Sequence, residues 1–239
     1  MSRTEKLTIF NILFMAVVLI FDIIYIMPFT HNPYIFKTIP SALFVIGGAI
    51  NLFFAHKEGF ADDKFKKFSL FIFVGLIFAM IGDIFLIENS LFVIGAGVFG
   101  IGHIMFFVAY LYLSKFKIRD LICFISIFIP SLMLILFYPG FTYDGFMKIL
   151  VIVYALIISL MLGKAFSNVF DKELPFMKKY LIFIGSLLFF ISDLCLLFYC
   201  FSATPLLIFD NLCLLTYYPA VTLLATSIYF ASRKNTTTN

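Results

Sequence analysis

Long apolar stretches alternate with short polar ones along the whole chain. Eight of the apolar stretches approach the roughly 20 residues that an α-helix needs to cross a bilayer. They cover approximately residues 7–27, 38–55, 68–87, 90–113, 121–138, 146–166, 180–200 and 204–231. Polar segments containing Lys, Asp, Asn, Gly and Pro separate them. The pattern predicts an all-α polytopic membrane protein with eight transmembrane helices, forming a single integral membrane domain over residues 1–239.

The composition supports this class of protein. Hydrophobic residues make up 63% of the 239 residues and charged residues 13%, whereas soluble domains are about 45–50% apolar and about 25% charged. The net charge of +4 is not gathered into a basic patch or a nucleic-acid-binding motif. We therefore expect membrane lipids, and no nucleic acid, as partners. The Cys, His and acidic residues do not have the spacing of metal ligands, and the sequence predicts neither a metal nor a cofactor.

The basic residues are divided unequally between the two ends of the predicted helices. With eight helices, 15 of the 17 Lys and Arg residues lie at the end that carries both termini, and only Lys37 and Lys148 lie at the other. An excess of Lys and Arg marks the cytoplasmic side of membrane proteins. This division predicts that both termini are cytoplasmic. With seven helices instead of eight, the basic residues would no longer gather on one side of the membrane.

Four acidic residues lie within the apolar stretches: Asp22, Asp83, Asp193 and Asp210. A carboxylate at the centre of a bilayer costs about 2.5–3.5 kcal/mol on insertion scales, so each of them requires a partner or a function. At 1.5 Å per residue, Asp83 and Asp193 lie roughly 20 Å along their helices from the cytoplasmic end. We expect function from these two. Asp22 and Asp210 lie nearer to helix ends, where a structural role is expected.

Two segments of the chain align with each other without gaps at an offset of 110 residues, namely 73–87 and 183–197. Five positions are identical, among them the pairs Gly75/Gly185 and Asp83/Asp193. The alignment predicts two parallel four-helix repeats, 1–113 and 114–239, related by an axis along the membrane normal. In such a protein the two aspartates would face each other across a central cavity.

A purely structural explanation also exists for each of these residues. Asp83 and Asp193 could simply be hydrogen-bonded to neighbouring helices, but their matching motif and depth favour a function. His103, which follows a glycine-rich stretch, is either a satisfied core residue or a partner of the carboxylates. The glycines themselves are typical of close helix packing and not of phosphate binding, because no strand precedes them and no Lys-Ser/Thr follows.

Five short motifs follow one another along the chain. They are Lys37-Thr38-Ile39-Pro40, Gly82-Asp83 with Leu86, Phe92/Gly95/Phe99/His103, Gly185 through Ser192-Asp193, and Thr216-Tyr217-Tyr218. In this order the motifs resemble the YhhN family of membrane lysoplasmalogenases, and the resemblance covers roughly residues 37–227. The chain departs from the family pattern at Phe106, where a Tyr is common, and at Val221, where a Gln is common. The second departure puts the part of the site that contains the Gln in doubt.

The resemblance implies hydrolysis of the vinyl ether bond of a lysoplasmalogen, which gives a fatty aldehyde and a glycerophospho-choline or -ethanolamine. Vinyl ethers hydrolyse by slow protonation of the β-carbon, followed by capture of the oxocarbenium ion by water. This chemistry requires one protonated carboxyl group and one carboxylate, as in the carboxyl pairs of glycosidases. A low-dielectric site shared by two carboxyl groups favours such a division of roles.

With this chemistry the family resemblance assigns roles to six residues. Asp83 and Asp193 are the predicted catalytic pair, without an indication of which is the acid, and His103 orients one of them or relays protons. The residues predicted to bind the phosphate headgroup of the lysophospholipid substrate are Lys37, Tyr217 and Tyr218.

Two other classes of membrane protein also use intramembrane carboxylates. A proton-coupled transporter, the main alternative, would show broken helices at matching positions in both halves, and only Pro219 suggests such an interruption. An intramembrane aspartyl protease would need Tyr-Asp, Gly-x-Gly-Asp and Pro-Ala-Leu motifs. Here Asp83 follows Met80-Ile81-Gly82, and Val221 follows Pro219-Ala220.

Overall fold

Eight α-helices account for most of residues 3–27 and 32–232, which are the residues that the computed structural model describes. The helices are α1 (Arg3–Ile26), α2 (Pro33–Glu58), α3 (Asp63–Phe85), α4 (Phe92–Leu113), α5 (Ile118–Phe137), α6 (Met147–Val169), α7 (Phe176–Phe201) and α8 (Leu207–Ser232). A short 3-10 helix, η1 (Asn89–Leu91), precedes α4. All eight α-helices are long and apolar enough to cross a membrane. The prediction of an all-α membrane protein is confirmed, and the described residues contain no strand beyond one isolated bridge.

Two helix boundaries differ from the predicted ones in a way that matters for the site. Helix α2 begins at Pro33 because Asn32 caps it: the Asn32 side chain accepts a hydrogen bond from the Ile35 N–H at 3.4 Å, and proline is favoured in the first turn. Lys37 therefore lies inside α2 and not in the preceding loop. At the other end of the bundle, α6 continues to Val169, beyond the predicted end at residue 166, so Lys164 lies more than a turn inside the helix.

The predicted interruption at Pro219 is wrong. Helix α8 runs from Leu207 to Ser232 with Pro219 inside it. Proline removes one N–H from the helix ladder, but neighbouring helices let membrane helices tolerate it. Pro40 in α2 and Pro130 in α5 are accommodated in the same way. The one residue that suggested the broken helices of a transporter therefore lies in a continuous helix.

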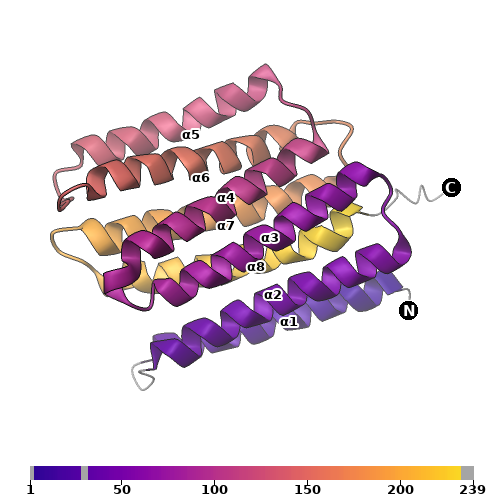
Figure 1. Cartoon of the computed structure of the whole chain (residues 1–239), viewed down its shortest axis with the longest axis horizontal. Coiled ribbons are helices and arrows are strands. Elements are labelled where there is room, and N and C mark those ends of the chain that lie inside the picture. Colours follow the sequence, from indigo (N-terminus) through magenta and orange to yellow (C-terminus); the bar gives the residue numbers. More distant parts are fainter. Residues whose placement is uncertain (1–2, 28–31, 233–239) are drawn as a thin grey trace.

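Six helices form a closed ring, in which successive neighbours pack in the order α2, α3, α4, α6, α7, α8 and back to α2. Helix α1 lies outside this ring against α2 and α8, and α5 lies outside it against α6 (Figure 1). The order of helices around the ring is unchanged when α2, α3 and α4 are exchanged with α6, α7 and α8, respectively. The two predicted halves, 1–113 and 114–239, are not fully equivalent, however, because α3 also packs on α8, whereas α7 and α4 share no comparable contact in the described chain. The outer helices differ, because the extensive contacts of α5 within the described chain are with α6 alone.

The closest helix pairs, α3 with α4 and α7 with α8, meet at glycines. A Cβ atom on Gly75 would lie 2.4 Å from the ring of Phe106, and one on Gly185 would lie 3.0 Å from Leu224. Both values are shorter than an ordinary carbon contact. The glycine that the two aligned segments share therefore lies at a close helix crossing in each half, as small residues commonly do in membrane proteins.

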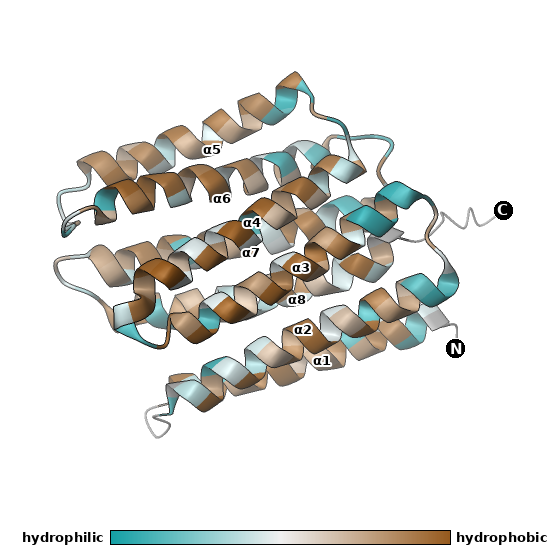
Figure 2. Cartoon of the chain, in the orientation of Figure 1, coloured by the Kyte–Doolittle hydropathy of each residue, from teal (hydrophilic) through white to brown (hydrophobic). Residues whose placement is uncertain are grey.

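The surface of the bundle has the polarity expected for a protein in a bilayer. Hydrophilic residues gather at the helix ends, and apolar residues occupy the middle of the helices (Figure 2). Large apolar side chains such as Ile12 and Ile118 are 62% and 72% exposed, which suits a surface in contact with lipid. The beginning of α1 and the end of α8 lie at the same end of the bundle (Figure 1).

Candidate functional site

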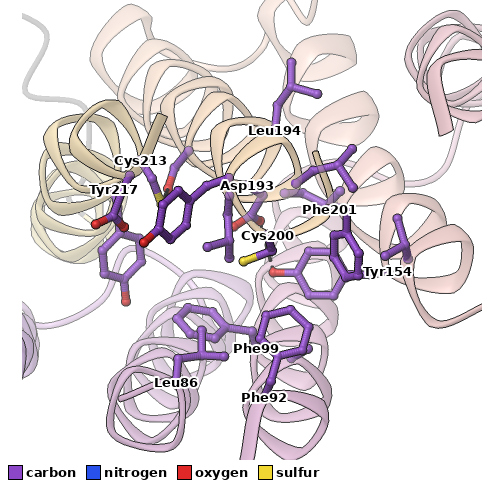
Figure 3. Close-up of a pocket in the computed structure, with 18 of the residues that line it drawn as sticks. Leu86, Phe92, Phe99, Tyr154, Asp193, Leu194, Cys200, Phe201, Cys213 and Tyr217 are labelled. Atoms are coloured by element: carbon purple, nitrogen blue, oxygen red, sulfur yellow. Dashed lines mark hydrogen bonds between the residues drawn. The ribbon is translucent and has the colours of Figure 1, made fainter. Parts of the chain in front are cut away.

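A cavity of about 390 Å³ opens within the bundle and is lined by residues from all eight helices. Figure 3 shows Asp193 near its centre, between Tyr217 on one side and Tyr154 on the other. Leu86 and Phe99 belong to the apolar wall beneath them (Figure 3). Because Asp83 also lines the cavity, the two aspartates of the aligned segments open onto one shared cavity.

Asp83 is held by two hydroxyl groups from different helices. Its Oδ2 atom accepts hydrogen bonds from the Ser41 hydroxyl of α2 and, at 2.7 Å, from the Tyr217 hydroxyl of α8. The Ser41 Oγ atom also lies 2.7 Å from the backbone carbonyl oxygen of Lys37. A serine hydroxyl has one proton, so Asp83 shares the Ser41 donor with a competing acceptor.

Asp193 is held by a tyrosine and a histidine. Its Oδ2 atom accepts a hydrogen bond from the Tyr154 hydroxyl of α6 at 3.0 Å and lies 3.1 Å from Nε2 of His103 on α4. His103 is fully buried against the Phe189 ring, and its Nε2 is also 2.9 Å from the Tyr154 oxygen. Its Nδ1 has no hydrogen-bond partner in the described part of the chain. The tautomer with the proton on Nε2 fits these contacts, because a buried proton on Nδ1 would lack an acceptor.

A second polar region of the cavity contains charged groups. Lys37 of α2 and Asp210, in the first turn of α8, both line the cavity. Neither side chain has a hydrogen bond or an ion pair in the described structure. Tyr25 and Tyr199 line the same region. Asp210, which we expected to be structural, therefore faces the cavity.

Asp22 behaves differently from Asp210. It is fully buried, neither carboxyl oxygen has a hydrogen-bond partner in the described residues, and it lies outside the cavity lining. The two groups are close enough to interact electrostatically. We have no physical account of the missing partner of Asp22.

At the end of the bundle that carries the termini, charged groups are paired. Lys164 Nζ lies 2.7 Å from Asp120 Oδ2, and both side chains are almost fully buried. Lys117 Nζ lies 2.8 Å from Asp171 Oδ2, and this hydrogen bond lowers the pKa of Asp171. These pairs join the start of α5, the end of α6 and the loop that follows it, and they account for their charges without any ligand.

The structure brings five of the six predicted site residues to the cavity, namely Lys37, Asp83, Asp193, Tyr217 and Tyr218. His103 lies behind Asp193 and reaches the site only through it and Tyr154. The Tyr217 hydroxyl is bound to Asp83, and the Tyr218 hydroxyl lies 3.4 Å from the Lys37 carbonyl oxygen.

Ser41 and Tyr154 were not predicted as site residues. Ser41 is one helical turn after Lys37, and Tyr154 is a polar group in the apolar helix α6. A search for hydroxyl groups in the apolar stretches would have found them, among many others. No group of three or more His, Cys, Asp or Glu side chains in the described chain is arranged to hold a metal ion.

Comparison with known proteins places this arrangement in a family. The model of the YhhN family matches residues 32–228, which include every residue of the cavity lining except Tyr25. No curated protein and no solved structure matches the chain.

Proposed function

Because the chain belongs to the YhhN family, and because Asp83 and Asp193 line one cavity, we propose that this multi-pass membrane protein is a lysoplasmalogenase. It hydrolyses the vinyl ether bond of a lysoplasmalogen by acid catalysis. The observation that supports the proposal best is the opening of both carboxyl groups onto one cavity with apolar walls. A lipid chain is the ligand that such walls suit, and two carboxyl groups are what the chemistry requires.

The proposed reaction begins with the proton of a carboxylic acid. The acid gives this proton to the β-carbon of the C=C–O unit, the π electrons form the new C–H bond, and an oxocarbenium ion results at the α-carbon. Water then attacks the α-carbon and releases a proton to the second carboxylate. The hemiacetal that forms collapses to the fatty aldehyde, and the glycerol oxygen leaves as a hydroxyl group. The pair of carboxyl groups ends with one proton, as it began.

The hydrogen bonds support Asp83 as the acid and Asp193 as the base. Asp193 receives the Tyr154 O–H and a share of the His103 Nε2–H, whose other acceptor, the Tyr154 oxygen, itself donates to Asp193, so both donors stabilise this carboxylate. Asp83 receives the Tyr217 O–H but shares the Ser41 proton with the Lys37 carbonyl. A carboxyl group with fewer committed donors holds its own proton more readily.

In this assignment His103 is a positioning residue. It does not line the cavity, so it cannot touch the substrate in this arrangement. Its Nε2–H holds Oδ2 of Asp193 and the Tyr154 oxygen at 3.1 and 2.9 Å. The other carboxylate oxygen of Asp193 is then left to accept a proton from water.

We further propose that both termini are cytoplasmic, on the basis of the basic residues at that end of the bundle. After replacement of the four cysteines of the chain, single cysteines at the exposed positions Thr142 and Lys172 give a matched test. An impermeant thiol reagent should label Thr142→Cys from outside and Lys172→Cys only after the membrane is opened. The reverse pattern would overturn this orientation.

The activity itself is tested with purified protein and two lipids, a lysoplasmalogen and its saturated-ether analogue. Only the vinyl ether should release aldehyde, and heavy water should place one deuterium on the carbon next to the aldehyde group. Aldehyde without this deuterium would exclude protonation of carbon. Proton-coupled uptake of a solute into vesicles, with no release of aldehyde, would identify a transporter.

A further inference from the structure

Two opposite charges without partners line the same cavity as the aspartate pair. The ammonium group of Lys37 and the carboxylate of Asp210 interact electrostatically, yet no ion pair joins them in the described structure. They lie on different helices, α2 and α8, which pack against each other in the ring.

Two pairs of charged groups at the end of the bundle that carries the start of α1 satisfy one another. Lys164 with Asp120 and Lys117 with Asp171 are direct pairs with N–O distances of 2.7 and 2.8 Å. Removing charges from water is costly unless they are paired. Two half-buried charges of opposite sign that face one cavity without touching are therefore suited to a ligand that carries both complementary charges.

We propose that Lys37 and Asp210 together bind the zwitterionic headgroup of the lipid, with the phosphate at Lys37 and the ammonium group at Asp210. A phosphoethanolamine or phosphocholine group holds its two charges one short linker apart, so it can meet both side chains at once. The phosphate contact at Lys37 belongs to the function proposed above, on which this inference rests. The role of Asp210 as the ammonium site is new.

Aromatic rings complete the proposed ammonium site. Tyr25 and Tyr199 both line the cavity, and Tyr199 is close enough to Asp210, Lys37 and Tyr25 to interact electrostatically with each. The face of an aromatic ring attracts an ammonium or trimethylammonium group, most strongly where water is excluded. Asp210 supplies the full negative charge, and the rings favour a cation over water.

The same arrangement discriminates against anionic headgroups. A phosphoglycerol lipid would neutralise Lys37 but leave Asp210 without a cation, inside a cavity that also holds Asp83 and Asp193. An unpaired charge in such a place weakens binding strongly. We therefore expect the protein to prefer the phosphoethanolamine lipid over the phosphoglycerol lipid by about tenfold or more in kcat/KM, which corresponds to about 1.4 kcal/mol.

The test compares vinyl ether lysolipids with phosphoethanolamine and phosphoglycerol headgroups on the purified full chain. Asp210→Asn should reduce the preference to within about twofold, chiefly by weakening turnover of the ethanolamine lipid. Asp210→Glu, which keeps the charge, should retain the preference. Asp144→Asn serves as the matched control, because Asp144 is exposed and lies outside the cavity.

Binding of the saturated-ether analogues separates this inference from the proposed activity. If the wild-type protein hydrolyses neither vinyl ether, the proposed function fails, but a preference for the ethanolamine analogue that Asp210→Asn abolishes still supports the subsite. The proposed ammonium site is overturned if the wild-type protein binds the two analogues equally. It is also overturned if Asp210→Asn leaves the preference unchanged. Should the Asn variant not remain monodisperse, competition on the wild-type protein decides, since glycerophosphoethanolamine should displace the analogue and glycerophosphoglycerol should not.

Discussion

Asp83 and Asp193 occupy matching positions in the two aligned segments, but different side chains hold them. Two hydroxyl groups, from Ser41 and Tyr217, surround Asp83, whereas Asp193 is bound by an imidazole and a phenol. The donors of Asp83 come from α2 and α8 and those of Asp193 from α6 and α4, helices that lie four places apart in the chain, but the chemistry of the donors differs. For the proposed reaction, this difference would favour the role of acid for one carboxyl group and the role of base for the other.

Each aspartate also takes one donor from either half of the chain. Tyr217, which bonds to Asp83, lies on α8, and His103, which bonds to Asp193, lies on α4. Neither half therefore contains a complete set of partners for its own carboxylate. Substitutions at the donors test whether the two environments are as different as their hydrogen bonds indicate.

The largest effect is expected when either carboxylate is removed. Asp83→Asn and Asp193→Asn should each lower kcat by about 10³-fold or more, because general acid and base groups contribute about 10²–10⁴-fold each. The measurement is aldehyde release at equal amounts of monodisperse protein, with Asp144→Asn as the control. Activity close to that of the wild type in either variant would remove that aspartate from the mechanism.

Loss of the donors to Asp193 should have the next largest effect and should appear at low pH. Tyr154→Phe and His103→Phe each leave the carboxylate with one donor fewer, which favours its protonated form. The acid limb of the kcat profile, where the base becomes protonated, should move to higher pH, with kcat at its optimum down about 10–100-fold. A shift of the alkaline limb instead would mean that Asp193 is the acid and Asp83 the base.

Loss of the Tyr217 donor should affect the opposite limb. Tyr217→Phe removes a hydrogen bond from the proposed acid, so Asp83 should keep its proton to higher pH. We expect the alkaline limb of the kcat profile to move upward, with about a tenfold fall in kcat as the carboxyl group loses its fixed orientation. Equal movement of both limbs would mean that the two carboxyl groups titrate as one coupled unit.

Ser41→Ala should have the smallest effect of the series. Because the Ser41 proton is already shared with the Lys37 carbonyl, its loss should cost only about two- to fivefold in kcat, near the lower range for a hydrogen bond. Kinetics across pH should show the alkaline limb shifted in the same direction as in Tyr217→Phe, but less. A larger loss than that of Tyr217→Phe would show that Ser41 is the principal donor to Asp83.

Much of the fold could be predicted from the sequence, because apolar length alone determines which segments can cross a bilayer. The ring order could not be predicted in the same way, since an almost uniformly apolar helix gives no indication of which face it buries or against which neighbour. Pro219 was misread because the rule that proline ends a helix comes from soluble proteins, whereas in a membrane protein neighbouring helices and hydroxyl side chains can satisfy the backbone groups that proline frees.

The candidate site was predictable to the extent that it consists of charges. Carboxylates are rare in apolar helices, so Asp83 and Asp193 stood out. Hydroxyl groups are common there and bond to their own helix backbone, as Ser41 does to Lys37. Ser41 and Tyr154 therefore could not be distinguished from ordinary helix residues until the folded chain placed them beside the aspartates. Asp210 was missed because its position near a helix end suggested contact with water.

The limited packing of α5 within the described chain has a consequence for how products would leave. Helix α5 contributes Ser131, Leu134 and Ile135 to the cavity wall, yet it packs extensively on α6 alone within the described chain. For the proposed reaction, the aldehyde could partition sideways past this wall into the bilayer, while the water-soluble fragment departs from the Lys37 and Asp210 region. Two products of opposite solubility would then have separate exits, and neither would have to retrace the path of the substrate.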